Sequence, residues 1–129
     1  MNALAHTQSE AHEVRINRST KDGEPDILIA NGKRYDLANS KLICSYTNDM
    51  PNSDSRYLRE RLYLSPNNRW YLVGDGGSDS KYQRRIGDKL VGRHNVIKDM
   101  QEREAFRFCQ QFASPELVQE YFANWLLDA

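Results

Sequence analysis

The stretch "RERLYLSPNNRWYLVG", residues 59–74, is the part of the chain that determines the fold. Leu62 and Leu64 alternate with Arg61, Tyr63 and Ser65, and this two-residue period is that of a strand. A polar loop at 66–68 interrupts the pattern, and an aromatic-rich run resumes at 70–73. Two aromatic-rich strands joined by a short polar loop are typical of an antiparallel hairpin, which we predict here.

A first hairpin is predicted upstream of this one. The pair Asn31-Gly32 separates 27–30 from 33–37, and both residues tolerate the positive φ that a type I′ turn requires. A third strand follows at 41–47, "KLICSYT", and "NVIK" at 95–98 is predicted as one more short strand. Alternation along 41–47 places three side chains on one face of that strand: Leu42, Cys44 and Tyr46.

The C-terminal part of the chain has the spacing of helices. Asp99 with Glu102 three residues later predicts a capping-box start, and Ser114-Pro115 predicts the N-cap and first residue of a second helix. Apolar residues follow at helical spacing: Ala105, Phe108, Cys109 and Phe112 in the first helix, and Leu117, Val118, Tyr121, Phe122, Trp125 and Leu126 in the second. We therefore predict an α+β fold, a small antiparallel sheet of two hairpins plus a connecting strand, packed by two C-terminal helices.

Length and composition limit the class of protein. A chain of 129 residues is about one domain long, and 39% apolar with 28% charged residues is typical of a soluble protein. Residues 1–25 carry few large apolar groups and predict a flexible arm ahead of a single domain at 26–129. No apolar run approaches the roughly 20 residues of a membrane span, and the N-terminus does not resemble a secretory signal. We expect a cytoplasmic protein of a bacterial host cell with reduced cysteines and no membrane partner.

Charge is distributed unevenly although the net charge is zero. Residues 1–55 hold 6 basic and 8 acidic side chains, residues 56–98 hold 10 and 4, and residues 99–129 hold 2 and 6, which gives −2, +6 and −4. A basic middle beside an acidic end predicts a polarised surface that attracts an acidic partner.

The glycine-rich stretch "VGDGGSDSKYQRR", residues 73–85, allows several interpretations. Its glycines do not have the spacing of a phosphate-binding loop, and Asp75 and Asp79 lack the pattern of a calcium loop. The favoured interpretation is a turn that ends the second hairpin, with glycines that adopt positive φ. No cofactor and no metal site is predicted.

The basic segment that follows is the predicted binding surface. Arginine side chains beside an aromatic ring suit contacts to phosphate groups and stacking on bases, and they equally suit an acidic protein surface. The predicted partner-binding residues are Arg69, Lys81, Tyr82, Arg84, Arg85, Lys89 and Arg93. Catalysis has little support, because the chain has no serine elbow or zinc signature. A dyad of Cys44 or Cys109 with His94 stays open as the least favoured alternative.

A resemblance adds to this interpretation. Leu62-Tyr63, Trp70-Tyr71-Leu72, Gly74-Asp75-Gly76-Gly77 and Ser80-Lys81-Tyr82 form a pattern that resembles a family of small uncharacterised bacterial and mobile-element proteins. The resemblance covers about residues 32–82 and implies a shared fold without an activity. Taken with the basic surface, it leads us to expect a non-enzymatic binding protein of mobile-element or phage origin. Its sharpest form is an anti-defence inhibitor of the anti-CRISPR type that occludes a host protein or ribonucleoprotein. The alternative is an accessory or regulatory protein that binds DNA or RNA.

Overall fold

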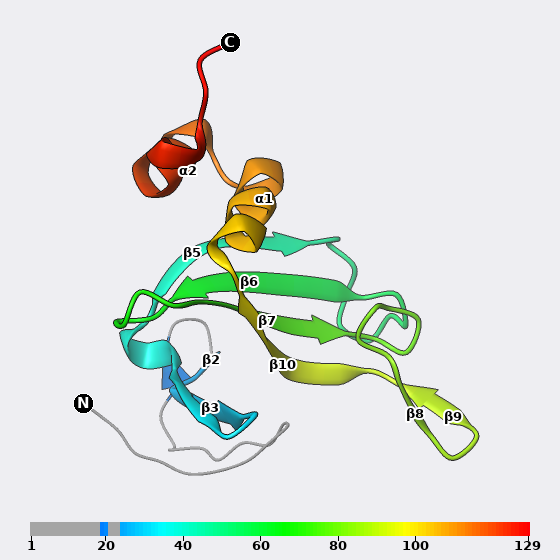
Figure 1. Cartoon of the computed structure of the whole chain (residues 1–129). Coiled ribbons are helices and arrows are strands. Elements are labelled where there is room, and N and C mark those ends of the chain that lie inside the picture. The colour runs from blue at the N-terminus through cyan, green and yellow to red at the C-terminus, as the bar shows by residue number, and fades with distance from the viewer. Residues whose placement is uncertain (1–18, 21–23) are drawn as a thin grey trace.

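The computed structural model describes residues 19–20 and 24–129. Its elements in chain order are β1 (Ser19–Thr20), β2 (Glu24–Pro25), β3 (Ile27–Ala30), β4 (Lys33–Asp36), the 3-10 helix η1 (Leu37–Asn39), β5 (Lys41–Thr47), β6 (Leu58–Leu64), β7 (Trp70–Gly76), β8 (Arg84–Ile86), β9 (Lys89–Val91), β10 (Arg93–Met100), α1 (Glu102–Phe112), α2 (Pro115–Phe122) and the 3-10 helix η2 (Ala123–Trp125). Antiparallel sheets followed by two C-terminal helices confirm the predicted α+β class. Figure 1 shows the helices on one side of the main sheet and the β3–β4 hairpin on the other.

The predicted hairpin at 59–74 is confirmed and forms the centre of a four-stranded antiparallel sheet with the order β10-β7-β6-β5. β6 and β7 pair in register from Leu58 opposite Gly76 to Leu64 opposite Trp70. Most residues of both strands are buried, because other elements cover both faces of the sheet. β5 and β10 form the two edges, so the strands predicted at 41–47 and 95–98 are also confirmed.

A bulge in the edge strand β5 changes which side chains face the core. The register of β5 against β6 shifts between Leu42 and Cys44. A bulge re-aims side chains locally, and here Ile43 is buried while Leu42 is 43% exposed. The prediction that Leu42 lies on one face with Cys44 and Tyr46 is therefore wrong: Leu42 is opposite Tyr63 and Cys44 is opposite Leu62, and only Cys44 and Tyr46 pack against the helix-covered core.

Helices α1 and α2 cover one face of the sheet (Figure 1). The apolar residues predicted at helical spacing in α1 include Ala105, Phe108 and Cys109, and all three are buried. In α2, Val118 and Phe122 are buried against the same core. This core also includes Ile43, Leu62 and Leu72 from the sheet.

The β3–β4 hairpin covers the opposite face. Its turn is the predicted one, because Asn31 and Gly32 have φ of 55° and 74°. The hairpin forms its own two-stranded sheet, and this differs from the single sheet that we predicted. The reason is its packing: residues of this layer bury their side chains on the main sheet and do not pair with its edge. The second core cluster consists of Leu28, Tyr35, Leu37, Tyr63, Tyr71 and Val73.

The two helix starts compare differently with the prediction. Ser114 caps α2 as predicted, because its hydroxyl accepts a hydrogen bond from the backbone amide of Leu117 at 3.2 Å. The start of α1 was predicted wrongly: Gln101 is the N-cap, and its backbone amide donates to Glu104 at 2.9 Å. Asp99 belongs instead to β10, and its carboxylate accepts hydrogen bonds from Lys33 and Tyr35 of β4.

The glycines at 74–77 were predicted to adopt positive φ in a turn, and this prediction is wrong. Gly74 and Gly76 lie within β7, and no glycine in this stretch has a positive φ. A Cβ on Gly74 would lie 2.0 Å from the ring of Tyr82, and one on Gly76 would lie 2.1 Å from the hydroxyl of Ser80. These glycines therefore provide space for the following segment, which folds back over the sheet.

Of the predicted flexible arm at 1–25, residues 1–18 and 21–23 lie outside the described residues. β1 and β2 pair with each other, and the side chain of Glu24 is buried beside Arg59 and Arg61. Within the described ranges, no helix has the length and apolar character needed to span a membrane.

Candidate functional site

The basic segment contains a separate two-stranded hairpin, β8–β9. Arg84 pairs with Val91 and Ile86 with Lys89, and the two-residue turn between the strands contains Gly87 with φ of 61°. A glycine at the first position of such a turn is typical of type II′ geometry. Figure 1 shows that this hairpin projects from the end of the main sheet.

The hairpin exposes cationic and apolar side chains together. All residues from 84 to 90 are exposed, and Ile86 and Leu90 keep 53% and 43% of their surface accessible. Because side chains opposite each other share a face, Ile86 and Lys89 lie on one face and Arg85 and Leu90 on the other. Three cations against one carboxylate, Asp88, give residues 84–91 a net charge of +2.

Three other predicted residues, Lys81, Tyr82 and Arg93, flank the hairpin and form contacts within the protein. Tyr82 is 8% exposed, and its hydroxyl donates to Glu60 at 2.6 Å. Burial and this bond raise the pKa of Tyr82, so the hydroxyl stays a donor. Lys81 forms an ion pair with Glu60 at 3.0 Å, and Nε of Arg93 donates to the carbonyl of Tyr82 at 2.9 Å. The ring of Tyr82 is therefore not a surface on which a base or a partner could stack.

Cations elsewhere in the basic block mostly have carboxylate partners. These pairs are Arg56 with Asp54, Arg59 with Glu24, Arg61 with Glu24 and Asp75, Lys81 with Glu60, and Lys98 with Glu104. In the part of the chain that the structure describes, Arg84, Arg85 and Lys89 form no such pair. Three of the five cations of the block that form no such pair among the described residues therefore lie on the β8–β9 hairpin, and the other two are Arg69 and Arg93.

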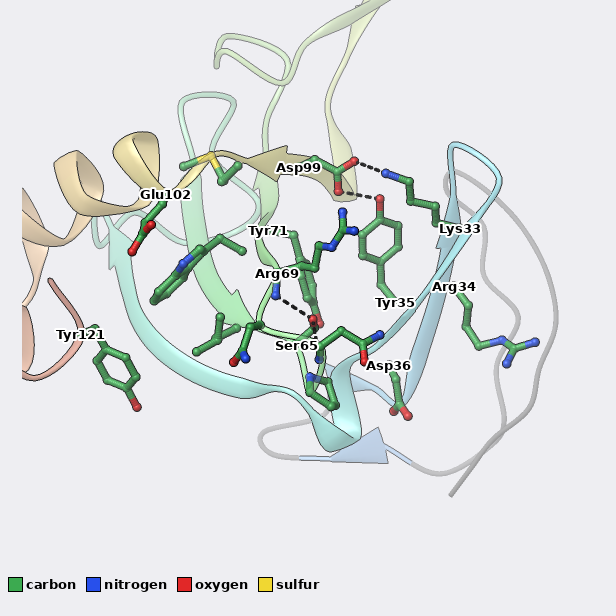
Figure 2. A pocket seen from close by; sticks show the side chains of 16 residues that line it. Lys33, Arg34, Tyr35, Asp36, Ser65, Arg69, Tyr71, Asp99, Glu102 and Tyr121 are labelled. Carbon is green, nitrogen blue, oxygen red and sulfur yellow. Dashed lines mark hydrogen bonds and ion pairs between the residues drawn. The ribbon is translucent and has the colours of Figure 1, made fainter.

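Arg69 lies apart from this hairpin, because it precedes β7 whereas the hairpin follows it. It lines an open groove of about 1240 Å³ between β4, the β6–β7 loop and the helices. Figure 2 shows Arg69 in the middle of this groove, with Tyr121 at one end and Arg34 at the other. The groove is lined by Lys33, Arg34, Tyr35, Asp36, Leu64, Ser65, Pro66, Asn67, Asn68, Arg69, Trp70, Tyr71, Asp99, Met100, Glu102 and Tyr121.

Asp99 organises one wall of the groove (Figure 2). Its carboxylate accepts hydrogen bonds from Nζ of Lys33 and from the hydroxyl of Tyr35, both at 2.8 Å. Burial alone raises the pKa of Asp99, but the bonds from Lys33 and Tyr35 and the nearby charge of Arg69 lower it more, so the net pKa lies below its usual value. These contacts tie β10 to the β3–β4 hairpin.

Asp99→Asn is expected to lower the free energy of unfolding by about 0.5 kcal/mol at neutral pH, because the charged hydrogen bonds that are lost are half-exposed and screened by solvent. The folded-state pKa of Asp99 is depressed, so its contribution is present above about pH 4 and is lost as the pH falls through the folded-state value. Urea unfolding at pH 7 and at about pH 3 should show the difference from wild type shrinking at the lower pH. Asp88→Asn in the exposed hairpin turn is the control, and equal stability of Asp99→Asn and wild type at pH 7 would contradict this role.

The described residues do not form the two alternative sites considered from the sequence, which are a calcium loop and a dyad of a cysteine with His94. Asp75 accepts from the backbone amide of Asn95 at 2.6 Å, and Asp79 accepts from the hydroxyl of Ser55 at 2.7 Å. No group of three or more potential metal ligands gathers anywhere in residues 24–129. The imidazole of His94 lies 3.8 Å from Asp75, on the sheet face opposite to the cysteines.

Comparison with known proteins finds no matching family, no similar curated protein and no similar solved structure. The resemblance to bacterial and mobile-element proteins therefore stays a prediction.

Sequence reasoning missed two features of the site. The pair Gly87-Asp88 between "RRI" and "KLV" is a recognised signal for a two-residue hairpin, and it could have identified β8–β9. The groove has no comparable signal, because its walls come from segments that are far apart in the sequence.

Proposed function

We propose that this chain is a non-enzymatic binding protein that grips an acidic protein or ribonucleoprotein through the β8–β9 hairpin. The observation that carries the proposal is the contrast in charge pairing. Arg84, Arg85 and Lys89 have no carboxylate partner among the described residues, whereas Arg59, Arg61 and Lys81 are paired with buried carboxylates. Unpaired cations on a projecting element are available to a partner without the loss of an internal ion pair.

The side chains of the hairpin have the chemistry of a protein interface. Arginine presents a planar set of donors that binds a carboxylate through two parallel hydrogen bonds. Ile86 and Leu90 lie beside these cations and supply apolar surface that a partner could bury. The combination favours a partner groove with acidic walls, in which charge speeds association and apolar burial slows dissociation.

The mobile-element origin and the anti-defence activity stay predictions from the sequence. If the chain is such an inhibitor, the β8–β9 hairpin would occupy an acidic groove of a host nuclease complex and occlude it. That mechanism requires no reaction and no cofactor, only a surface that remains folded when the partner is absent.

The double variant Arg84→Glu with Arg85→Glu is expected to weaken partner binding by at least about tenfold, because each attraction becomes a repulsion. The matched control is Lys41→Glu with Arg107→Glu, which makes the same change in net charge on β5 and α1. Pull-down from a nuclease-treated bacterial lysate should recover the partner with wild type and the control, and all three proteins should melt at similar temperatures. Full recovery with the hairpin variant would show that the hairpin is not the contact surface.

A second candidate function is the binding of single-stranded nucleic acid in the groove. It is favoured by Arg34 and Arg69, which line the groove without an ion pair among the described residues, and by Trp70, which lines the same groove. Titration with labelled DNA and RNA oligonucleotides between about 50 and 200 mM salt separates the two functions, because phosphate contacts weaken steeply with salt. In that case Arg69→Glu would reduce affinity and the hairpin variant would not; no binding at low salt eliminates this candidate.

A further inference from the structure

The two cysteines of the chain meet in the folded protein. Cys44 lies on β5 and Cys109 on α1, 65 positions apart in the sequence, and their Sγ atoms are 3.7 Å from each other. Both are free thiols in the structure. Cys109 is fully buried on the side of α1 that faces the core, whereas Cys44 is only partly buried on the edge strand of the sheet.

The bulge in β5 accounts for this contact. The register against β6 shifts between Leu42 and Cys44, and the consecutive residues Ile43 and Cys44 both pack against the helix-covered core. In a regular strand, neighbours point to opposite faces, so one of the two would have pointed away from α1. The bulge thus lets Cys44 reach Cys109 while Ile43 keeps its place in the core.

The two thiols differ in acidity. The hydrogen bond with Cys109 lowers the pKa of Cys44 and outweighs its burial. The same bond, together with burial, raises the pKa of Cys109. Cys44 is therefore the more accessible thiol and the one that forms a thiolate more readily. Cys109 is buried and stays protonated.

We propose that Cys44 and Cys109 are a peroxide-sensitive pair that closes into a reversible disulfide between β5 and α1. The oxidant is a hydroperoxide. The Cys44 thiolate attacks the distal peroxide oxygen, the O–O bond breaks, and the leaving alkoxide or hydroxide takes up a proton to leave as an alcohol or water. The Cys109 sulfur then attacks the Cys44 sulfenic acid: the S–S bond forms, the S–O bond breaks, and the hydroxide leaves as water with the Cys109 proton. Two thiols are oxidised and one peroxide is reduced.

The geometry suits a closure without a large rearrangement. A disulfide requires its sulfur atoms at about 2.05 Å, so they must approach by about 1.7 Å from their contact distance. The helix is already held close to this part of the strand, because the rings of Tyr46 and Phe112 lie 4.6 Å apart. Closure would replace a packing contact between the helical layer and an edge strand by a covalent bond that encloses a long loop.

Mass spectrometry of the native protein after a small excess of hydrogen peroxide tests the proposal directly. We expect a loss of about 2 Da, the disappearance of both free thiols, and full reversal by a dithiol reductant. The melting temperature of the oxidised protein should rise by about 10 °C, because the bond restricts the unfolded chain. A gain of oxygen without the 2-Da loss, or a disulfide only between two molecules, would overturn the proposal.

Single variants assign the order of the steps. Cys109→Ala should accumulate a sulfenic acid at Cys44 that a dione reagent traps, because the resolving thiol is absent. Cys44→Ala should leave Cys109 unreacted in the folded protein, because that thiol is buried. Equal peroxide reactivity of the two single variants in the native state would contradict the assigned roles, and their melting curves show whether each is folded.

Discussion

Arg61→Leu is expected to lower the free energy of unfolding by about 3–5 kcal/mol, the range for removing one partner of a buried ion pair. The side chain of Arg61 is 3% exposed and contacts Glu24 and Asp75, with its terminal nitrogen 3.1 Å from the Asp75 carboxylate. The substitution leaves both carboxylates buried with fewer cationic partners. Arg59, which also contacts Glu24, compensates only one of them.

A double variant separates the ion pair from simple packing. Asp75→Asn keeps an oxygen that accepts from the backbone amide of Asn95, so it removes the charge and retains that hydrogen bond. We expect the loss in Arg61→Leu with Asp75→Asn to be clearly smaller than the sum of the two single losses, because the two single variants both remove the same Arg61–Asp75 pair. Urea unfolding measures all four proteins. A loss below about 1 kcal/mol for Arg61→Leu would show that the cluster contributes little to stability.

Local patterns predicted the elements of this fold correctly because their causes are local. The two-residue period along 59–74 follows from strand geometry, and Asn31-Gly32 forms its turn because both residues tolerate positive φ. Ser114 caps α2 through a bond to a residue only three positions away. None of these interactions depends on where distant segments lie.

The arrangement of the elements was not predictable in the same way. Whether the β3–β4 hairpin extends the sheet or covers its face depends on how its side chains fit Tyr63 and Tyr71. The bulge in β5 likewise has no local signal, because it follows from the fit of Ile43 and Cys44 beneath α1. Both are properties of packing in three dimensions.

The predicted site was correct in composition and incomplete in geometry. A count of charges identifies the basic block, yet it cannot show which cations find an internal carboxylate. Lys81 does, through Glu60, and Arg84 does not among the described residues. The aromatic character of Tyr82 suggested an exposed ring, and only Gly74 on the adjacent strand explains why that ring is buried.

The absence of a side chain at two further glycines has large expected consequences. A Cβ on Gly77 would lie 2.3 Å from the carbonyl oxygen of Ser55, and one on Gly92 would lie 2.2 Å from the carbonyl oxygen of Gly76. Both neighbours are backbone atoms, which cannot rotate away as a side chain can. The segment after Gly77 is bound to the Ser55 turn, since the amide of Asp79 donates to that same carbonyl at 2.7 Å.

Gly77→Ala and Gly92→Ala are therefore each expected to lower the free energy of unfolding by about 3 kcal/mol, at the upper end of the cost of overpacking. Gly32→Ala and Gly87→Ala are the matched controls. Their φ is positive but the space around them is open, so each should cost roughly 1–2 kcal/mol through backbone strain alone. Urea unfolding of the four variants compares the free-energy cost of overpacking with the cost of backbone strain. If Gly92→Ala costs no more than Gly87→Ala, the close approach of β7 to the strand entering β10 is not a constraint, and the base of the β8–β9 hairpin is looser than its contacts indicate.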